Sequence, residues 1–184
     1  MIGATSEQKT ELNDYFGQRV RRNNAAAAKV EQIYFYDFGM EVRLLEEYCA
    51  QADLVFLLEW VFIETVDREM MQRHFSLSAI VLATLIKYQN ICPVFLLSTP
   101  LAEDFIPELY SEFGQTKAAQ ESLLDWYKKE TGAKVWTWRT RESELRRTEK
   151  FLRKIEEVLE SYVCGTPVKC KDLYFQKQKF TNFV

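Results

Sequence analysis

The sequence predicts a single three-layer α/β domain whose small, mainly parallel sheet has about four or five strands. Four short apolar blocks support this prediction, at residues 33–36, 54–58, 93–97 and 135–138. Each block precedes a charged stretch with helical periodicity, and such alternation is typical of parallel strands joined by crossover helices. The 184 residues, 47% hydrophobic and 28% charged, have the size and balance of one ordinary globular domain.

The first 50 residues are predicted to contain two helices with a strand between them. Apolar residues at helical spacing predict a helix over 5–22 and another over 40–50. The segment 33–38 between them is rich in Tyr and Phe and is predicted to form a strand that ends at Gly39.

The centre of the chain is predicted to contain two buried strands joined by a long helix. The strands lie at 54–63 and 93–97, and both are apolar without alternation, as expected of strands that are covered on both faces. Apolar residues at helical spacing predict the connecting helix over 67–89.

The remaining elements follow in the order helix, strand, helix. An acidic, partly helical connection over 101–114 leads into a helix over 116–130. Residues 135–138 alternate in polarity and are predicted to form an edge strand. The helix predicted over 143–162 has the most regular apolar face in the chain.

Two divisions of the chain are predicted from composition. Residues 1–163 are assigned to the single α/β domain, including its N-terminal helix, and residues 164–184 to a basic, aromatic C-terminal tail. The tail carries four lysines against one aspartate, which leaves the preceding residues with a net charge near −6. A basic tail on an acidic body is suited to an acidic protein partner, whereas a terminus packed on the surface is the simpler interpretation.

An all-α bundle is the alternative for the N-terminal half. Residues 25–90 contain one glycine, Gly39, and no proline, so little in this region interrupts a helix. A short apolar run cannot be assigned to a buried strand or a buried helix by periodicity alone. The fold of the N-terminal half is therefore left open between these two.

Polar residues follow the predicted strands, at the edge of an open parallel sheet where ligands bind. The candidate ligand-binding residues are Asp37, Ser98, Thr99, Arg139 and Arg141. Glu41 and Glu69 are candidates for acid, base or nucleophilic chemistry in the same crevice. This mixture could bind a nucleotide or nucleoside, although charged residues at strand ends are more often helix caps and solvated turns.

The chain has no glycine-rich phosphate loop of either common kind. Neither Gly-x-Gly-x-x-Gly nor Gly-x-x-x-x-Gly-Lys-Ser/Thr occurs, which argues against kinases, GTPases and classical dehydrogenases. A nucleotide would have to be held by helix N-termini and arginines. No cofactor is predicted.

His74 is the only histidine, so a site with several histidine ligands to a metal is excluded. Arg68 precedes it with five residues between them, and this spacing resembles the Arg-x4-6-His motif of HEPN-type ribonucleases. The resemblance implies RNA cleavage at a helical dimer interface, with Arg68 at the phosphate and His74 in proton transfer. Because that family is all-helical, the resemblance also requires the all-α alternative.

Composition also bounds the compartment and the partners. Four cysteines with one histidine do not form a zinc-site pattern, and Cys49 and Cys92 are predicted to be buried thiols. We expect a cytoplasmic protein, since no segment has the roughly 20 apolar residues that a membrane helix needs. A net charge of −3 makes duplex nucleic acid an unlikely partner.

The favoured hypothesis is a non-catalytic protein-interaction or regulatory module, a subunit or adaptor of a larger assembly. It rests on the lack of a complete catalytic set, the aromatic content and the basic tail. Whether the chain is an enzyme is left open, and the alternatives are a nucleotide- or nucleoside-binding enzyme or sensor and a HEPN-like ribonuclease. A protein partner is expected, a homo-oligomer is considered, and the predicted partner-binding residues are Trp136, Trp138, Lys177 and Lys179.

Overall fold

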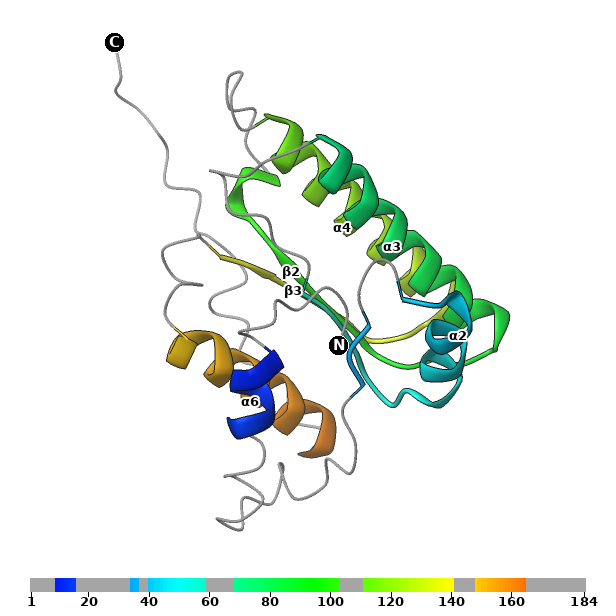
Figure 1. Cartoon of the computed structure of the whole chain (residues 1–184), viewed down its shortest axis with the longest axis vertical. Coiled ribbons are helices and arrows are strands. Elements are labelled where there is room, and N and C mark those ends of the chain that lie inside the picture. Colours follow the sequence, from blue (N-terminus) through cyan, green and yellow to red (C-terminus); the bar gives the residue numbers. More distant parts are fainter. Residues whose placement is uncertain are drawn as a thin grey trace.

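The computed structural model describes residues 9–15, 34–36, 40–58, 68–102, 111–140 and 148–164. These residues form a small α/β domain in which a three-stranded parallel sheet lies between helices, as Figure 1 shows. The predicted fold class is confirmed. The all-α alternative was wrong, because the apolar block near residue 55 pairs in the sheet instead of continuing a helix.

The sheet has the strand order β1-β2-β3, and both neighbouring pairs are parallel. The strands are β1 (Val55–Leu57), β2 (Val94–Ser98) and β3 (Val135–Arg139). Every residue of β1 and β2 is buried, whereas β3 is mostly half-buried. This burial explains why the sequences of β1 and β2 are continuous apolar runs, whereas the sequence of β3 alternates in polarity.

The two crossover helices lie together on one face of the sheet. They are α3 (Arg68–Lys87) and α4 (Ser111–Thr131), which pack against each other along their length. Because both crossovers step the same way across the sheet and crossovers are right-handed, both helices must cover the same face. The short helix α2 (Val42–Gln51) packs beside α3 (Figure 1).

The opposite face of the sheet is covered by α6 (Thr148–Cys164) and by the helical residues 9–15 (Figure 1). These two segments are joined by a hydrogen bond of 2.6 Å that the Tyr15 hydroxyl donates to the Glu156 carboxylate. The sheet is therefore the middle of three layers.

Two apolar clusters fill the spaces between the layers. The strand residues on the α6 side include Phe56, Phe95, Leu97 and Trp138. Those on the α3–α4 side include Val55, Leu57, Val94 and Leu96. The alternation follows from the two-residue period of a strand, which sends successive side chains to opposite faces.

The described residues form three strands where four or five were predicted, and several predicted boundaries differ from those observed. Within 33–38, Tyr36 forms only an isolated bridge, and residues 37–39 lie outside the described part. The Tyr36 hydroxyl donates to the Met40 carbonyl at 3.0 Å. The helix predicted over 116–130 begins earlier, at Ser111, and the one predicted over 143–162 spans Thr148–Cys164.

Gly114 allows α4 to pass close to a neighbouring turn of the chain. The helix passes close to η3 (Pro100–Ala102), a single turn that follows β2. A Cβ atom at residue 114 would lie 2.5 Å from the Leu101 carbonyl oxygen. Glycine, usually unfavourable in a helix, is here the residue that allows the close approach.

Side-chain hydrogen bonds connect the helices to the segment before β2. The Asn90 amide donates to the carbonyl oxygens of Cys49 (2.6 Å) and Ala52 (2.9 Å) at the end of α2. The Tyr127 hydroxyl of α4 donates to the Cys92 carbonyl at 3.0 Å. None of the helices within the described ranges is both long and apolar enough to span a bilayer.

Cys49 and Cys92 are buried free thiols, as predicted. Burial raises the pKa of Cys49 to about 11 and that of Cys92 to about 12. Because the thiolate is the reactive form, we expect both to resist iodoacetamide in the folded protein at pH 8 and to react fully in 6 M guanidinium, about the concentration that unfolds stable domains. Peptide mass mapping over time measures this, with glutathione in the same tube as the reference. Modification of either cysteine at the glutathione rate would contradict the prediction.

Candidate functional site

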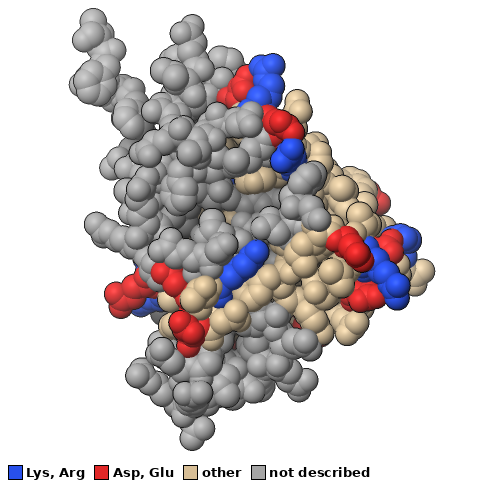
Figure 2. All heavy atoms as spheres, viewed as in Figure 1, with Lys and Arg blue, Asp and Glu red and all other residues tan. Residues whose placement is uncertain are grey.

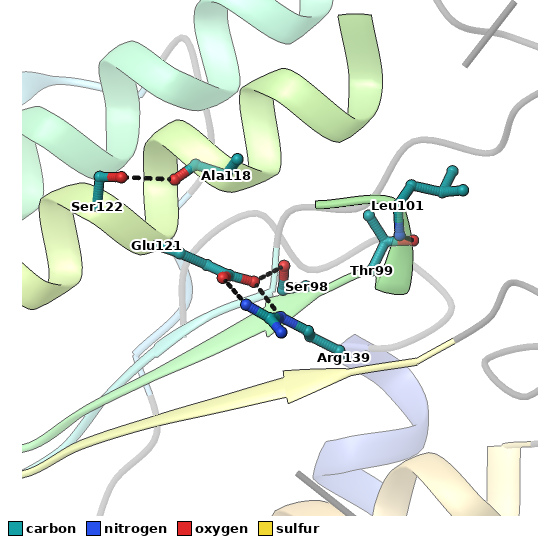
Figure 3. A network of polar contacts seen from close by, with 7 residues as sticks. All are labelled: Ser98, Thr99, Leu101, Ala118, Glu121, Ser122 and Arg139. Carbon is teal, nitrogen blue, oxygen red and sulfur yellow. Dashed lines mark hydrogen bonds and ion pairs between the residues drawn. The ribbon is translucent and has the colours of Figure 1, made fainter. Parts of the chain in front are cut away.

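Ser98 and Arg139 lie side by side at the carboxyl ends of β2 and β3, where the sheet register pairs them directly. Glu121 of α4 reaches both, as Figure 3 shows. The Arg139 guanidinium donates from Nε to Glu121 Oε1 at 2.9 Å and from Nη2 to Oε2 at 2.5 Å. The Ser98 hydroxyl donates to Oε1 at 2.5 Å. One carboxylate thus joins α4 to two strands.

The same edge of the sheet holds a buried lysine one helical turn before Glu121. The Lys117 ammonium donates to the Leu97 carbonyl at 3.1 Å, and its side chain is fully buried. Thr140 follows β3, and its amide donates to the Ser98 carbonyl at 2.9 Å, which extends the strand pairing past the last strand residues. We refer to Ser98, Lys117, Glu121 and Arg139 as the sheet-end cluster.

Burial controls the protonation of Glu121. Its side chain is 15% exposed and that of Arg139 is 24% exposed. Burial raises the pKa of the Glu121 carboxyl, whereas the Ser98 hydrogen bond and the charge of Lys117 act against this rise. The bidentate guanidinium also favours the ionised carboxylate, since charge-assisted pairs of this geometry are the strong ones.

The arrangement limits the chemistry that the sheet-end cluster can perform. An anionic ligand that approaches Arg139 must compete with the Glu121 carboxylate, which already occupies two of the guanidinium donors. A carboxylate paired with a guanidinium is a poor base for activating Ser98. These contacts are those of a structural cross-link between α4 and the sheet.

Comparison with solved structures yields a structural resemblance that is weak. No family model matches the chain, and no curated protein matches it. Among solved structures, it resembles the crystal structure of the capsular polysaccharide assembling protein CapF from Staphylococcus aureus, with a TM-score of 0.45 and 19% sequence identity. The similarity covers 67% of this chain and 30% of that chain. A likeness of this degree carries no argument about function.

The structure brings together some of the predicted ligand-binding residues. Ser98, Thr99 and Arg139 all lie at the carboxyl edge of the sheet, where Ser98 and Thr99 are buried. Asp37 and Arg141 lie outside the described residues. Within the described ranges, no group of three or more His, Cys, Asp or Glu side chains is placed to hold a metal.

Sequence reasoning missed Glu121 and Lys117, the two cluster residues on α4. An available signal was their spacing of four residues, which puts both on one side of a helix. Opposite charges four apart are common on exposed helix faces, so this signal does not distinguish a buried pair.

Of the two candidate acid or base residues, Glu41 is the N-cap residue of a helix and Glu69 lies on one. Glu41 is exposed and immediately precedes α2, where its carbonyl accepts a hydrogen bond from the Leu44 amide at 3.0 Å. Glu69 forms an ion pair with Arg73, one turn further along α3. Whether either carboxylate has a chemical role stays a prediction.

Arg68 and His74 both lie on α3, and the six helical steps from one to the other place their side chains about 120° apart around its axis. Arg68 is exposed and forms an ion pair of 2.6 Å with Glu112 of α4, which raises the pKa of Arg68 and lowers that of Glu112. The HEPN resemblance depended on an all-helical fold, and the parallel sheet removes that support.

The two tryptophans of β3 point toward α6 and contribute to the core on that side. Trp138 is buried, with the Lys154 ammonium 5.9 Å from its ring, and Trp136 is half-buried beside it. Lys177 and Lys179 lie outside the described residues. A partner-binding role for these four stays a prediction.

A second surface lies on the outer side of α3 and α4. Residues 74–86 of α3 contain no Asp, Glu, Lys or Arg. Figure 2 shows the helical layer from the side, with charged side chains toward its two ends and uncharged residues between them. We call this surface the helix-pair face, and its residues are Gln72, Ser76, Ala79, Ile80 and Ala83 of α3 and Gln115, Ala119, Ser122 and Trp126 of α4.

The helix-pair face exposes large apolar groups and contains a groove. Ile80 is 44% exposed and Trp126 is 45% exposed. The groove, of about 550 Å³, lies between the N-terminal halves of the two helices. Met71, Phe75 and Ala119 supply its apolar part, and the ion pair of Arg68 and Glu112 lies beside them.

Proposed function

We propose that this chain is a non-catalytic protein-interaction module, a subunit or adaptor of a larger assembly, and that the helix-pair face makes the contact. The observation that carries the proposal is the exposure of Trp126 and Ile80 on a face whose α3 side has no Asp, Glu, Lys or Arg over residues 74–86. Exposed apolar surface rimmed by polar groups is typical of protein-binding sites, and tryptophan is among the residues most enriched in binding hot spots.

The contacts within the sheet-end cluster support the part of the proposal that says the chain is non-catalytic. Its guanidinium and carboxylate are paired with each other, and Ser98 donates into the same carboxylate. A site prepared for an anionic substrate would instead keep such donors directed at the ligand. We therefore infer that the cluster holds α4 on the sheet.

A nucleotide or nucleoside site is the competing function, because Ser98 and Arg139 occupy the edge where open sheets bind ligands. We expect that NAD, ATP, cyclic nucleotides and nucleosides will leave the melting temperature of the full chain unchanged. A true ligand at 100 times its Kd would raise the free energy of unfolding by about 2.7 kcal/mol. For a domain of this size, this corresponds to a rise in melting temperature of roughly 5–10 °C. A dose-dependent rise in melting temperature that Arg139→Gln abolishes would refute the non-catalytic part of the proposal.

The interaction part is tested with purified components. Proteins that co-purify with the tagged full chain are produced singly and titrated against it by calorimetry. We expect a stoichiometric complex that Trp126→Ala weakens at least tenfold, since truncation of a hot-spot residue costs about 2 kcal/mol or more. Tyr162→Ala on α6 is the matched control, because Tyr162 is similarly exposed but belongs to the helix on the other side of the sheet. Equal weakening by both variants would refute the assignment of this face.

A further inference from the structure

We propose that the occupant of the helix-pair face is a second copy of this chain, related by a two-fold axis that places Trp126 of each copy in the groove of the other. The inference rests on the proposed function, since it names the partner of the same face. A two-fold contact requires one surface to be complementary to itself, and this face presents both a half-exposed indole, Trp126, and a groove.

Trp126 and the groove are suitably separated along α4. The groove uses residues Glu112 to Ala119, and Trp126 follows on the same outward side of the helix. Trp126 lies 7 to 14 residues beyond the groove residues of α4, which is about 10–21 Å at about 1.5 Å per residue. A two-fold axis that lies across the outer surface of α4 near Ser122, roughly halfway between them, therefore places each Trp126 against the partner's groove.

The residues near this axis permit close contact. Ser122 is small, and its hydroxyl donates to the Ala118 carbonyl at 2.9 Å within the same helix (Figure 3). Thr116, in the groove, donates in the same way to the Glu112 carbonyl at 2.8 Å. Because both donors are satisfied within the helix, covering them does not leave an unpaired hydroxyl proton.

Area and charge both allow this contact. Helices of 20 and 21 residues are about 30 Å long, and two of them side by side are about 20 Å wide. Covering this face would bury about 600 Å² per copy, or about 1,200 Å² in total, at the lower limit of specific interfaces. Each end of the face carries both signs, with Arg68 and Glu112 at one and Lys129 and Glu130 at the other. An antiparallel pair can therefore match opposite charges at both ends.

The first test is the oligomeric state of the full chain. Sedimentation equilibrium from about 1 to 200 µM is expected to show a dimer with micromolar Kd, as suits an interface of this size. We expect Trp126→Ser to raise the Kd at least tenfold and Ala119→Arg, in the groove, to abolish the dimer. Tyr162→Ser should leave the Kd unchanged, and melting curves confirm that each variant is folded. A monomer throughout this range, or a dimer indifferent to Ala119→Arg, would overturn the inference.

A second test locates the axis. In a chain with Cys164→Ser and Cys170→Ser, the added change Ser122→Cys is expected to form an intermolecular disulfide rapidly under mild oxidation, because the two copies of residue 122 meet at the axis. Lys150→Cys, an exposed position on α6, is the control and should stay reduced. Equal cross-linking at both positions would count against the axis.

The two proposals fail differently. A chain that binds a nucleotide at the sheet end but still dimerises through Trp126 would end the non-catalytic proposal and keep the dimer. A chain that stays monomeric but binds another purified protein through Trp126 would do the reverse.

Discussion

Arg139→Gln is expected to lower the free energy of unfolding by about 2–3 kcal/mol at pH 7, somewhat less than for a fully buried ion pair because both partners keep some exposure. The change removes the guanidinium that joins β3 to α4 and leaves the Glu121 carboxylate among groups that do not neutralise it fully. Urea unfolding followed by circular dichroism measures the loss.

The loss should depend on pH in a definite direction. Burial already raises the pKa of Glu121, and removal of the guanidinium raises it further. Since the pKa is then higher in the folded state than in the unfolded chain, the variant loses stability as the pH rises above the ordinary value of 4.5. At lower pH the carboxyl is protonated and the difference from the wild type should shrink.

A double-mutant cycle separates the pair from its surroundings. Glu121→Gln combined with Arg139→Gln leaves two neutral amides in place of the two charges, and we expect it to be more stable than Arg139→Gln alone. Arg153→Gln, an exposed residue of α6, controls for loss of a positive charge and should change stability by less than about 0.5 kcal/mol. Additive effects of the two cluster substitutions would show that the pair is not coupled.

Gly114→Ala is expected to destabilise the protein by about 1–3 kcal/mol, although alanine is the better helix former by about 1 kcal/mol. The new methyl group would collide with the Leu101 carbonyl oxygen, which is backbone and cannot rotate away. Either α4 or η3 must then move. Thermal and urea unfolding measure the loss, and Gly114→Val should increase it.

The control for Gly114 is a substitution on the same helix without a nearby obstacle. Glu130→Ala lies on the exposed side near the end of α4 and should alter stability by less than about 0.5 kcal/mol. If Gly114→Ala stabilised the protein, as alanine does in an unhindered helix, the close approach to η3 would be refuted.

The sequence predicted the strands best where the local composition was compatible with a strand and not with a helix. The strands at 93–97 and 135–138 are short and lie next to proline and glycine, so a helix there was difficult to justify. The aromatic segment around Tyr36 had the composition of a strand. Its observed contacts are a turn made by the Tyr36 hydroxyl and a stack of Tyr34 on Tyr48, and no propensity scale contains either.

The residues that the strands contribute to the candidate site could be predicted from the sequence, whereas those that α4 contributes were missed. Ser98 and Arg139 could be named because they end strands that run in the same direction. Glu121 could not, because its role depends on how α4 is rotated about its axis. That rotation is fixed by tertiary contacts, such as the approach of Gly114 to Leu101, which are distant in sequence.

The order of the three strands in space repeats their order in the chain. In doubly wound sheets the order reverses once, and the connections on either side of the reversal diverge to opposite faces and open a crevice for the ligand. Across β1, β2 and β3 there is no reversal, so the connections do not part. The same regularity sends both crossover helices to one face, where they make a broad paired surface. Among the strands that the structure describes, this topology therefore places both connecting helices side by side as one platform.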